Sequence, residues 1–138
     1  MPKSISLLLL GIAFACGGCA KTPEPVCMAP GHIDDGSCTT ALLNILASPE
    51  SYEGKTVSVL GFVEVVPGNN GEAIFFYPSR DARALQATTT AVRVRAEGRQ
   101  LELIRGRHRV EAPAYASGVF TRAASSSGML GEIRVRSE

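Results

Sequence analysis

The chain has 138 residues, of which 45% are hydrophobic and 20% are charged, with a net charge of +1. This balance excludes a wholly disordered chain and a protein with many membrane spans, and the length leaves room for one domain with one core. The charge is unevenly spread: residues 21–79 carry two lysines and seven acids, and residues 80–138 carry 11 arginines and six acids. Because a barrel interleaves such halves in space, this asymmetry alone predicts no single basic face.

The first 15 residues have the features of a secretory signal peptide. Lys3 provides a basic start, and an apolar run from Ile5 to Ala15 follows it, too short for a permanent transmembrane helix. The small residues that precede a cysteine resemble the lipobox of bacterial lipoproteins, in which a peptidase cuts before the cysteine and its sulfur receives a diacylglyceryl group. The resemblance implies a lipid anchor at Cys16, with Cys19 as the alternative.

Each candidate anchor departs from the lipobox at one position. Cys16 directly follows the apolar run but has Phe14 two positions before it, whereas Cys19 would place Cys16 where the family usually has Leu, Val or Ala. An ordinary cleaved signal or a buried N-terminal helix remains the alternative. Since each buried methylene contributes about 0.8 kcal/mol, acyl chains would hold the protein on a membrane. In this family, Asp directly after the cysteine favours retention in the inner membrane. Neither cysteine is followed by Asp, so we expect the outer membrane, with the protein facing the periplasm.

Residues 16–38 are expected to form a flexible tether, because prolines and polar residues dominate them. Cys27 and Cys38 fall within it, and export would place them in an oxidising compartment. A disulfide between them would close a short loop and contribute about 3 kcal/mol to stability. If Cys16 carries the lipid, Cys19 is left over, and this odd count favours Cys19 as the anchor.

The tether also holds His32, Asp34 and Asp35 between the two cysteines. Imidazole, thiolate and carboxylate groups all bind metals, but the spacing matches neither a closed zinc site nor a calcium loop. Turn formation explains Asp and Gly in this segment. We therefore predict no metal and no cofactor.

Residues 39–138 carry the pattern of a mainly β domain with one N-terminal helix. The helix is expected over residues 41–48, capped by Thr39 or Thr40. The longest predicted strand runs from Lys55 to Val66, where valines alternate and Gly61 permits a bend. A turn or short helix is expected over residues 78–87, and Leu101–Ile104 as a connector that ends at Gly106. The other expected strands lie within residues 73–77, 91–96, 107–122 and 131–136.

The opening of this domain resembles a group of small, mostly uncharacterised bacterial OB-fold-like domains. The shared features are the Leu-rich helix, the turn of Pro49, Glu50, Tyr52, Gly54 and Lys55, and the strand that ends at Gly61 and Phe62. The resemblance implies a five-stranded Greek-key barrel that serves as a binding scaffold, and it implies no reaction. The family's Gly-His-Met-Gly turn is Gly128-Met129-Leu130-Gly131 here, so any role of that His is lost.

The chemistry-bearing residues favour binding over catalysis. The histidines are His32, in the tether, and His108, flanked by two arginines and expected at the rim or outer side of a strand; no serine or carboxylate is visibly assigned to either. If the strands at residues 91–96 and 131–136 are neighbours, four arginines form an anion-binding surface: Arg93, Arg95, Arg134 and Arg136.

These patterns predict a lipoprotein whose barrel binds a protein or an anionic envelope component. Phosphate-rich headgroups, acidic glycans and acidic proteins suit the arginines, and export argues against nucleic acid. A solvated arginine face, partly neutralised by Glu97 and Glu132, is the plainer interpretation. The functional alternative is an enzyme or metal-dependent protein that uses His32 or His108, and a purely structural spacer would need neither feature.

Overall fold

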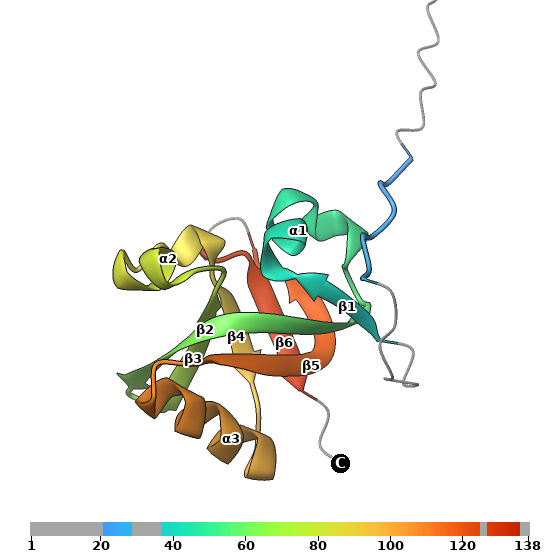
Figure 1. Ribbon diagram of the computed structural model, residues 1–138. Helices are drawn as coiled ribbons and strands as arrows, with labels where there is room; N and C mark the ends of the chain where they lie inside the picture. The colour runs from blue at the N-terminus through green and yellow to red at the C-terminus, as the bar shows by residue number, and fades with distance from the viewer. Residues whose placement is uncertain (1–20, 29–36, 125–126, 136–138) are drawn as a thin grey trace, which may run out of the picture.

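The computed structural model describes residues 21–28, 37–124 and 127–135, so the predicted signal peptide lies outside the described residues. These residues form a mainly β domain built on a small closed barrel, consistent with an OB-like fold (Figure 1). The strands are β1 (Cys38–Ala41), β2 (Thr56–Gly68), β3 (Gly71–Tyr77), β4 (Val92–Arg95), β5 (Pro113–Arg122) and β6 (Gly131–Val135). The α-helices are α1 (Leu42–Ala47), α2 (Arg80–Ala84) and α3 (Gly98–Arg109), and short 3₁₀ turns span Pro49–Ser51 and Thr88–Thr90.

Strand β2 is the element on which the barrel is built. The predicted alternation is confirmed, because Val57, Val59 and Val63 have no exposed surface. The strand pairs with β5 over its first half and with β3 over its second half, and Gly61 lies next to the change of partner. A Cβ atom on Gly61 would lie 2.8 Å from the side chain of Phe76, so glycine lets the bent strand approach β3.

Five strands close the barrel in the order β2, β3, β4, β6 and β5, and β5 returns to β2. Neighbouring strands are antiparallel except for β4 and β6, which run parallel. The sixth strand, β1, lies outside this ring and pairs in parallel with the first half of β2. The predicted five-stranded barrel is thereby confirmed, with a short extra strand at its edge.

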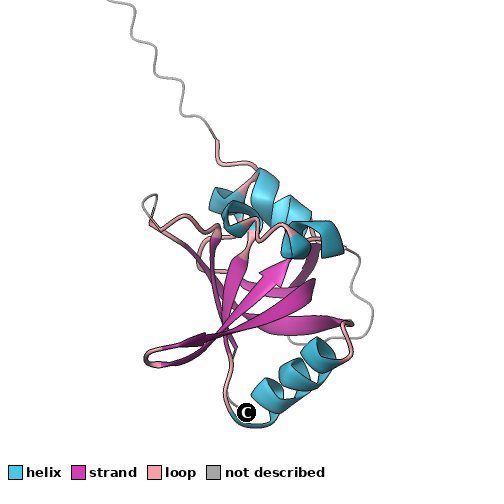
Figure 2. Ribbon diagram, turned by 90° about the vertical axis from the view of Figure 1, so that its left-hand side faces the viewer, coloured by secondary structure: helices cyan, strands magenta, loops and turns pink. Residues whose placement is uncertain are grey.

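Helices cover the two ends of the barrel (Figure 2). Helix α1 and the β1 edge lie at one end, and α3 lies at the other, against β2 and β5. Leu42 and Ile45 of α1 and Ile104 of α3 join the valines of β2 in one core. Each helix therefore plugs the barrel with one or two apolar side chains.

Two local predictions were wrong. Residues 101–104 are part of helix α3 rather than a connector, and the fourth barrel strand begins at Pro113, after that helix. Thr39 and Thr40 do not cap the first helix, because they belong to β1, and Ala41 at the start of α1 makes no side-chain capping bond. The parallel pairing with β2 uses the backbone groups of these threonines instead.

The segment of residues 21–28 is fastened to the barrel near β1. Cys27 and Cys38 form the predicted disulfide. The hydroxyl groups of Thr40 and Tyr52, both in fully buried residues, lie 2.7 Å and 3.1 Å from the carbonyl oxygen of Val26, and the Val26 amide donates to the Tyr52 hydroxyl at 3.0 Å. Because a buried hydroxyl without a partner is destabilising, these bonds make residue 26 part of the folded unit.

None of the helices described is long and apolar enough to span a bilayer.

Candidate functional site: an arginine surface on β4 and β6

Three of the four predicted arginines lie together on the outside of the barrel. Arg93 and Arg95 alternate with Val92 and Val94 along β4, whose valines are buried in the core. Strand β6 is the parallel neighbour of β4, and its Arg134 is the register partner of Arg95. We call Arg93, Arg95 and Arg134 the arginine surface. The fourth predicted member, Arg136, lies outside the described residues.

One carboxylate, Glu132, partly neutralises this surface. Its Oε2 atom accepts a hydrogen bond from Arg95 Nε at 2.7 Å, and its Oε1 atom lies 3.7 Å from the guanidinium of Arg134. Arg93 is the register partner of Glu132, but within the described part of the chain it forms no ion pair. Arg93 therefore retains an uncompensated charge, and Arg134 is held only loosely.

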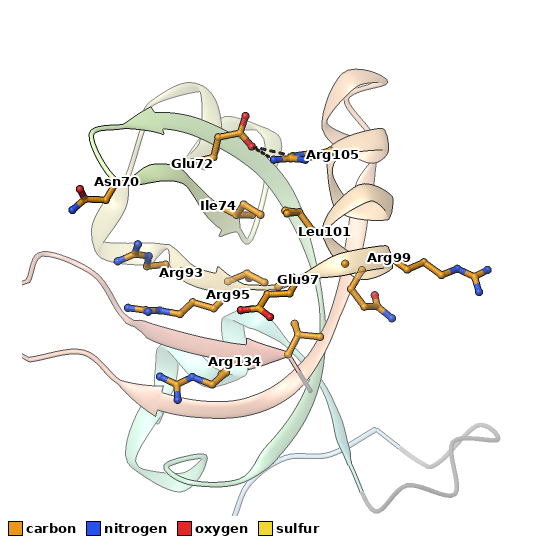
Figure 3. Close-up of a pocket in the computed structure, with 15 residues that line it drawn as sticks. Asn70, Glu72, Ile74, Arg93, Arg95, Glu97, Arg99, Leu101, Arg105 and Arg134 are labelled. Atoms are coloured by element: carbon orange, nitrogen blue, oxygen red, sulfur yellow. Dashed lines mark hydrogen bonds and ion pairs between the residues drawn. The ribbon is translucent and has the colours of Figure 1, made fainter. Parts of the chain in front are cut away.

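The arginine surface forms one wall of an open hollow of about 990 Å³. Figure 3 shows the side chains of Arg93, Arg95 and Arg134 extending to the same side, with Asn70 of the β2–β3 turn above them. The start of α3 forms the opposite wall, where Glu97 and Leu101 lie. Most of the residues that line the hollow are polar or charged, so a ligand bound there would be held mainly by ionic contacts and hydrogen bonds.

An ion-pair cluster fixes the upper rim of this hollow. Arg105 of α3 donates two hydrogen bonds to Glu72 of β3, at 3.0 Å and 2.7 Å, and a third to Glu102. These carboxylates raise the pKa of the Arg105 guanidinium above its ordinary value. Arg105 is therefore paired with Glu72 and Glu102, and it holds α3 against the β2–β3 hairpin. Arg99 points away from the hollow in Figure 3.

The sequence located the β part of this site and missed the helical part. The period-two pattern singled out Arg93, Arg95 and Arg134 because alternate residues of a strand share a face. Arg99 and Arg105 were not predicted, because α3 was taken for a connector. A repeat of apolar residues at Leu101 and Ile104, three positions apart, is the signal that could have found this helix.

His108 lies in a second, shallower hollow between α2, α3 and β2, of about 530 Å³. The prediction that placed it on a strand was wrong, because it belongs to the last turn of α3. Its Nδ1 atom lies 3.1 Å from the carbonyl oxygen of Val63, which also accepts from Arg83 at 3.3 Å. Since a carbonyl oxygen cannot donate, Nδ1 carries the proton, and in neutral His108 Nε2 is the free acceptor.

Two helix ends meet at this second hollow with unusual backbone geometry. Gln86 follows α2 with φ of 49°, and Glu111 follows α3 with φ of 53°, positions that glycine usually occupies. The Gln86 amide donates to Glu64 at 3.3 Å, and Glu111 lies 3.5 Å from Arg83. The first contact links the end of α2 to β2, and the second links the end of α3 to α2.

The structure brings His108 near the carboxylates of Glu64 and Glu111, but none of the described residues that line that hollow is Ser, Thr or Cys. His32, the other predicted histidine, lies outside the described residues, as do the candidate anchors Cys16 and Cys19. The described ranges contain no group of three or more His, Cys, Asp or Glu side chains arranged to hold a metal ion.

Comparisons with known proteins add no identification. No protein-family model, curated protein or solved structure matches the chain.

Proposed function

We propose that this chain is a cell-envelope lipoprotein whose barrel binds an anionic partner through the arginine surface. A lipid at Cys16, or alternatively Cys19, would hold it on the outer membrane, facing the periplasm. The partner is an anionic envelope component or an acidic protein. The signal-like N-terminus supports the location, and the disulfide between Cys27 and Cys38 is compatible with an oxidising compartment.

The observation that carries the binding proposal is the convergence of Arg93, Arg95 and Arg134 on one hollow. Glu132 pairs with Arg95 and Arg134, Glu72 is paired with Arg105, and Glu97 lines the hollow as well. Guanidinium groups offer paired donors that match the oxygens of phosphate and carboxylate groups. Arg93 has no resident ion-pair partner in the described chain, so a ligand oxygen would replace only water there. Strands β4 and β6 fix the backbone positions from which the three arginines extend, which lowers the entropy lost when a ligand binds.

The test is titration of the mature protein with inorganic tripolyphosphate and with polygalacturonate, a phosphate-rich and a carboxylate-rich probe. The double variant Arg93→Gln/Arg134→Gln should weaken binding about tenfold or more, since hydrogen bonds between charged groups contribute about 1.5–3 kcal/mol each. The matched control is Arg107→Gln/Arg109→Gln, which removes the same charge from α3, away from the arginine surface. Equal weakening in both would show that only net charge matters and would contradict the proposal.

A second candidate function, a reaction at His108, is favoured by the hollow that this residue shares with Glu64 and Glu111. The free Nε2 atom could act as a base on a bound substrate. The variant His108→Gln separates the two functions, because it should leave binding of both probes unchanged.

A further inference from the structure

The barrel has a second outer face whose character is the opposite of the arginine surface. On the paired strands β2 and β5, the positions that alternate with core residues carry no charge: Thr56, Ser58, Leu60, Phe62, Pro113, Tyr115, Ser117 and Val119. At its centre, Leu60 and Tyr115 are register partners, and they are 42% and 65% exposed. Leu60 and Tyr115 thus form an exposed apolar pair on the β2–β5 face. Arg80 lies over the Phe62 ring at 5.8 Å, and Arg134 of β6 is the register partner of Val119, so charged groups border this pair.

This face continues onto the edge strand and the first helix. Ala41 of β1 is the register partner of Leu60, and Leu43, two residues further on, is exposed. Beside β1, Val26 and Met28 of the N-terminal segment also have exposed side chains. We call Val26, Met28, Leu43, Leu60 and Tyr115 the apolar surface. They are five of the nine large hydrophobic residues found exposed in the described part of the chain.

The bonds of Val26 place the origin of the N-terminal tether at the β1 edge of the barrel. The Val26 carbonyl oxygen accepts from the buried side chain of Thr40, on the core side of β1, and Leu60 lies on the outer side of the neighbouring half of β2. From Val26 back to Cys19 or Cys16 is seven or ten residues, which span at most about 25 Å or 36 Å when fully extended. A lipid on either cysteine would therefore keep the β1 edge close to the bilayer.

The order of strands around the barrel puts the arginines of β4 on a different side from the β2–β5 pair, whereas Arg134 on β6 lies directly beside β5. Strand β4 is separated from the β2–β5 pair by β3 on one side and by β6 on the other. When the β2–β5 face lies against a bilayer, the Arg93 and Arg95 side chains on β4 point away from that bilayer. The domain would then expose its binding site to partners in the aqueous compartment.

We infer that the apolar surface docks onto the membrane that carries the lipid anchor, at the level of the headgroups, and thereby orients Arg93 and Arg95 outward. This inference rests on the lipid anchor of the proposed function. Tyr is a residue that favours the membrane interface, because its ring is apolar and its hydroxyl remains hydrated. A short tether gives an effective concentration in the millimolar range, so weak contacts suffice for docking.

The experiment uses the acylated full-length mature chain in phosphatidylcholine vesicles whose acyl chains are brominated. The natural sequence has no Trp, so a single Trp reports on one position. The fluorescence of a Tyr115→Trp variant should be quenched by bromine at least about twice as strongly as that of Leu103→Trp, because insertion depends on the apolar face. Leu103 is a matched control, since it is similarly exposed but lies on α3, at the other end of the barrel.

Adding Leu60→Glu to the Tyr115→Trp variant should remove most of this quenching, and circular dichroism verifies that the variant is folded. Equal quenching at positions 115 and 103, or none at position 115 in an acylated chain, would overturn the docking while leaving anion binding untouched. Mass spectrometry of the mature chain is done first. An unacylated product would overturn the anchor of the proposed function and the docking together.

Discussion

At the scale of single residues, Tyr77 shows how burial and a neighbouring charge act together. Tyr77 ends β3 and is almost fully buried, and its hydroxyl is hydrogen-bonded to the carboxylate of Glu64. Burial, followed by the hydrogen bond and the negative charge of Glu64, raises the pKa of Tyr77 to about 12. All three effects favour the neutral phenol in the folded state.

This shift predicts a loss of stability at alkaline pH. Between pH 10 and pH 12 the unfolded chain loses the Tyr77 proton while the folded chain retains it, so the free energy of unfolding falls as pH rises. The contribution of Tyr77 to this fall is at most about 2–3 kcal/mol. Urea unfolding at pH 8, 10 and 11.5 should give a shallower fall for Tyr77→Phe than for the natural protein. Tyr115→Phe, which removes an exposed phenol, should not change the slope; a shallower slope in both variants would argue against the assignment.

The arginine surface could be predicted at this scale because it obeys a strand rule. Alternation fixes which side of a strand a residue occupies, and the valines of β4 had to face the core. The partners of these arginines were beyond the sequence. Arg95 meets Glu132 only because β4 and β6 run parallel in this register, which results from the closure of the whole barrel.

At the scale of elements, β2 and α3 show what a local pattern reveals. Strand β2 has buried valines at alternate positions over most of its length, so its place and its bend were predicted within two residues. Helix α3 has Ile104 as its one fully buried residue among five charged positions and two glycines, and Gly106 in its interior suggested an end. Its stability comes from packing on β2 and β5. These contacts depend on the tertiary structure, so the local sequence of the helix does not reveal them.

That dependence on tertiary packing predicts a large effect of Ile104→Ala. Ile104 belongs to the core, where its removal leaves a cavity between α3, β2 and β5. We expect the free energy of unfolding to fall by about 2–4 kcal/mol. The neighbouring Leu103→Ala, at an exposed position of the same helix, should change it by less than about 0.5 kcal/mol. Similar effects of the two substitutions in urea denaturation would mean that α3 is not held by its buried side chain.

At the scale of the whole molecule, the barrel separates two surfaces that need different environments. The uncharged β2–β5 face and the arginines of β4 lie on different sides of one closed ring of strands. A closed barrel keeps these faces apart rigidly, because no strand can shift without breaking the ring. The N-terminal segment leaves the barrel at the β1 edge, so a lipid anchor of the kind proposed above would fix the direction in which the β4 arginines point.

That attachment point depends on the disulfide, and its removal gives the last prediction. Cys27 and Cys38 are 11 residues apart, so the bond limits the unfolded chain and should contribute about 3 kcal/mol to stability on the loop-entropy model. The double variant Cys27→Ser/Cys38→Ser should be less stable by about that amount in urea. The bonds from Thr40 and Tyr52 to Val26 remain in this variant, so its folded spectrum should be unchanged. Reductant should lower the urea midpoint of the natural protein to that of the variant and leave the midpoint of the variant unchanged. Equal urea midpoints of the two proteins without reductant would show that hydrogen bonds alone hold residues 21–28.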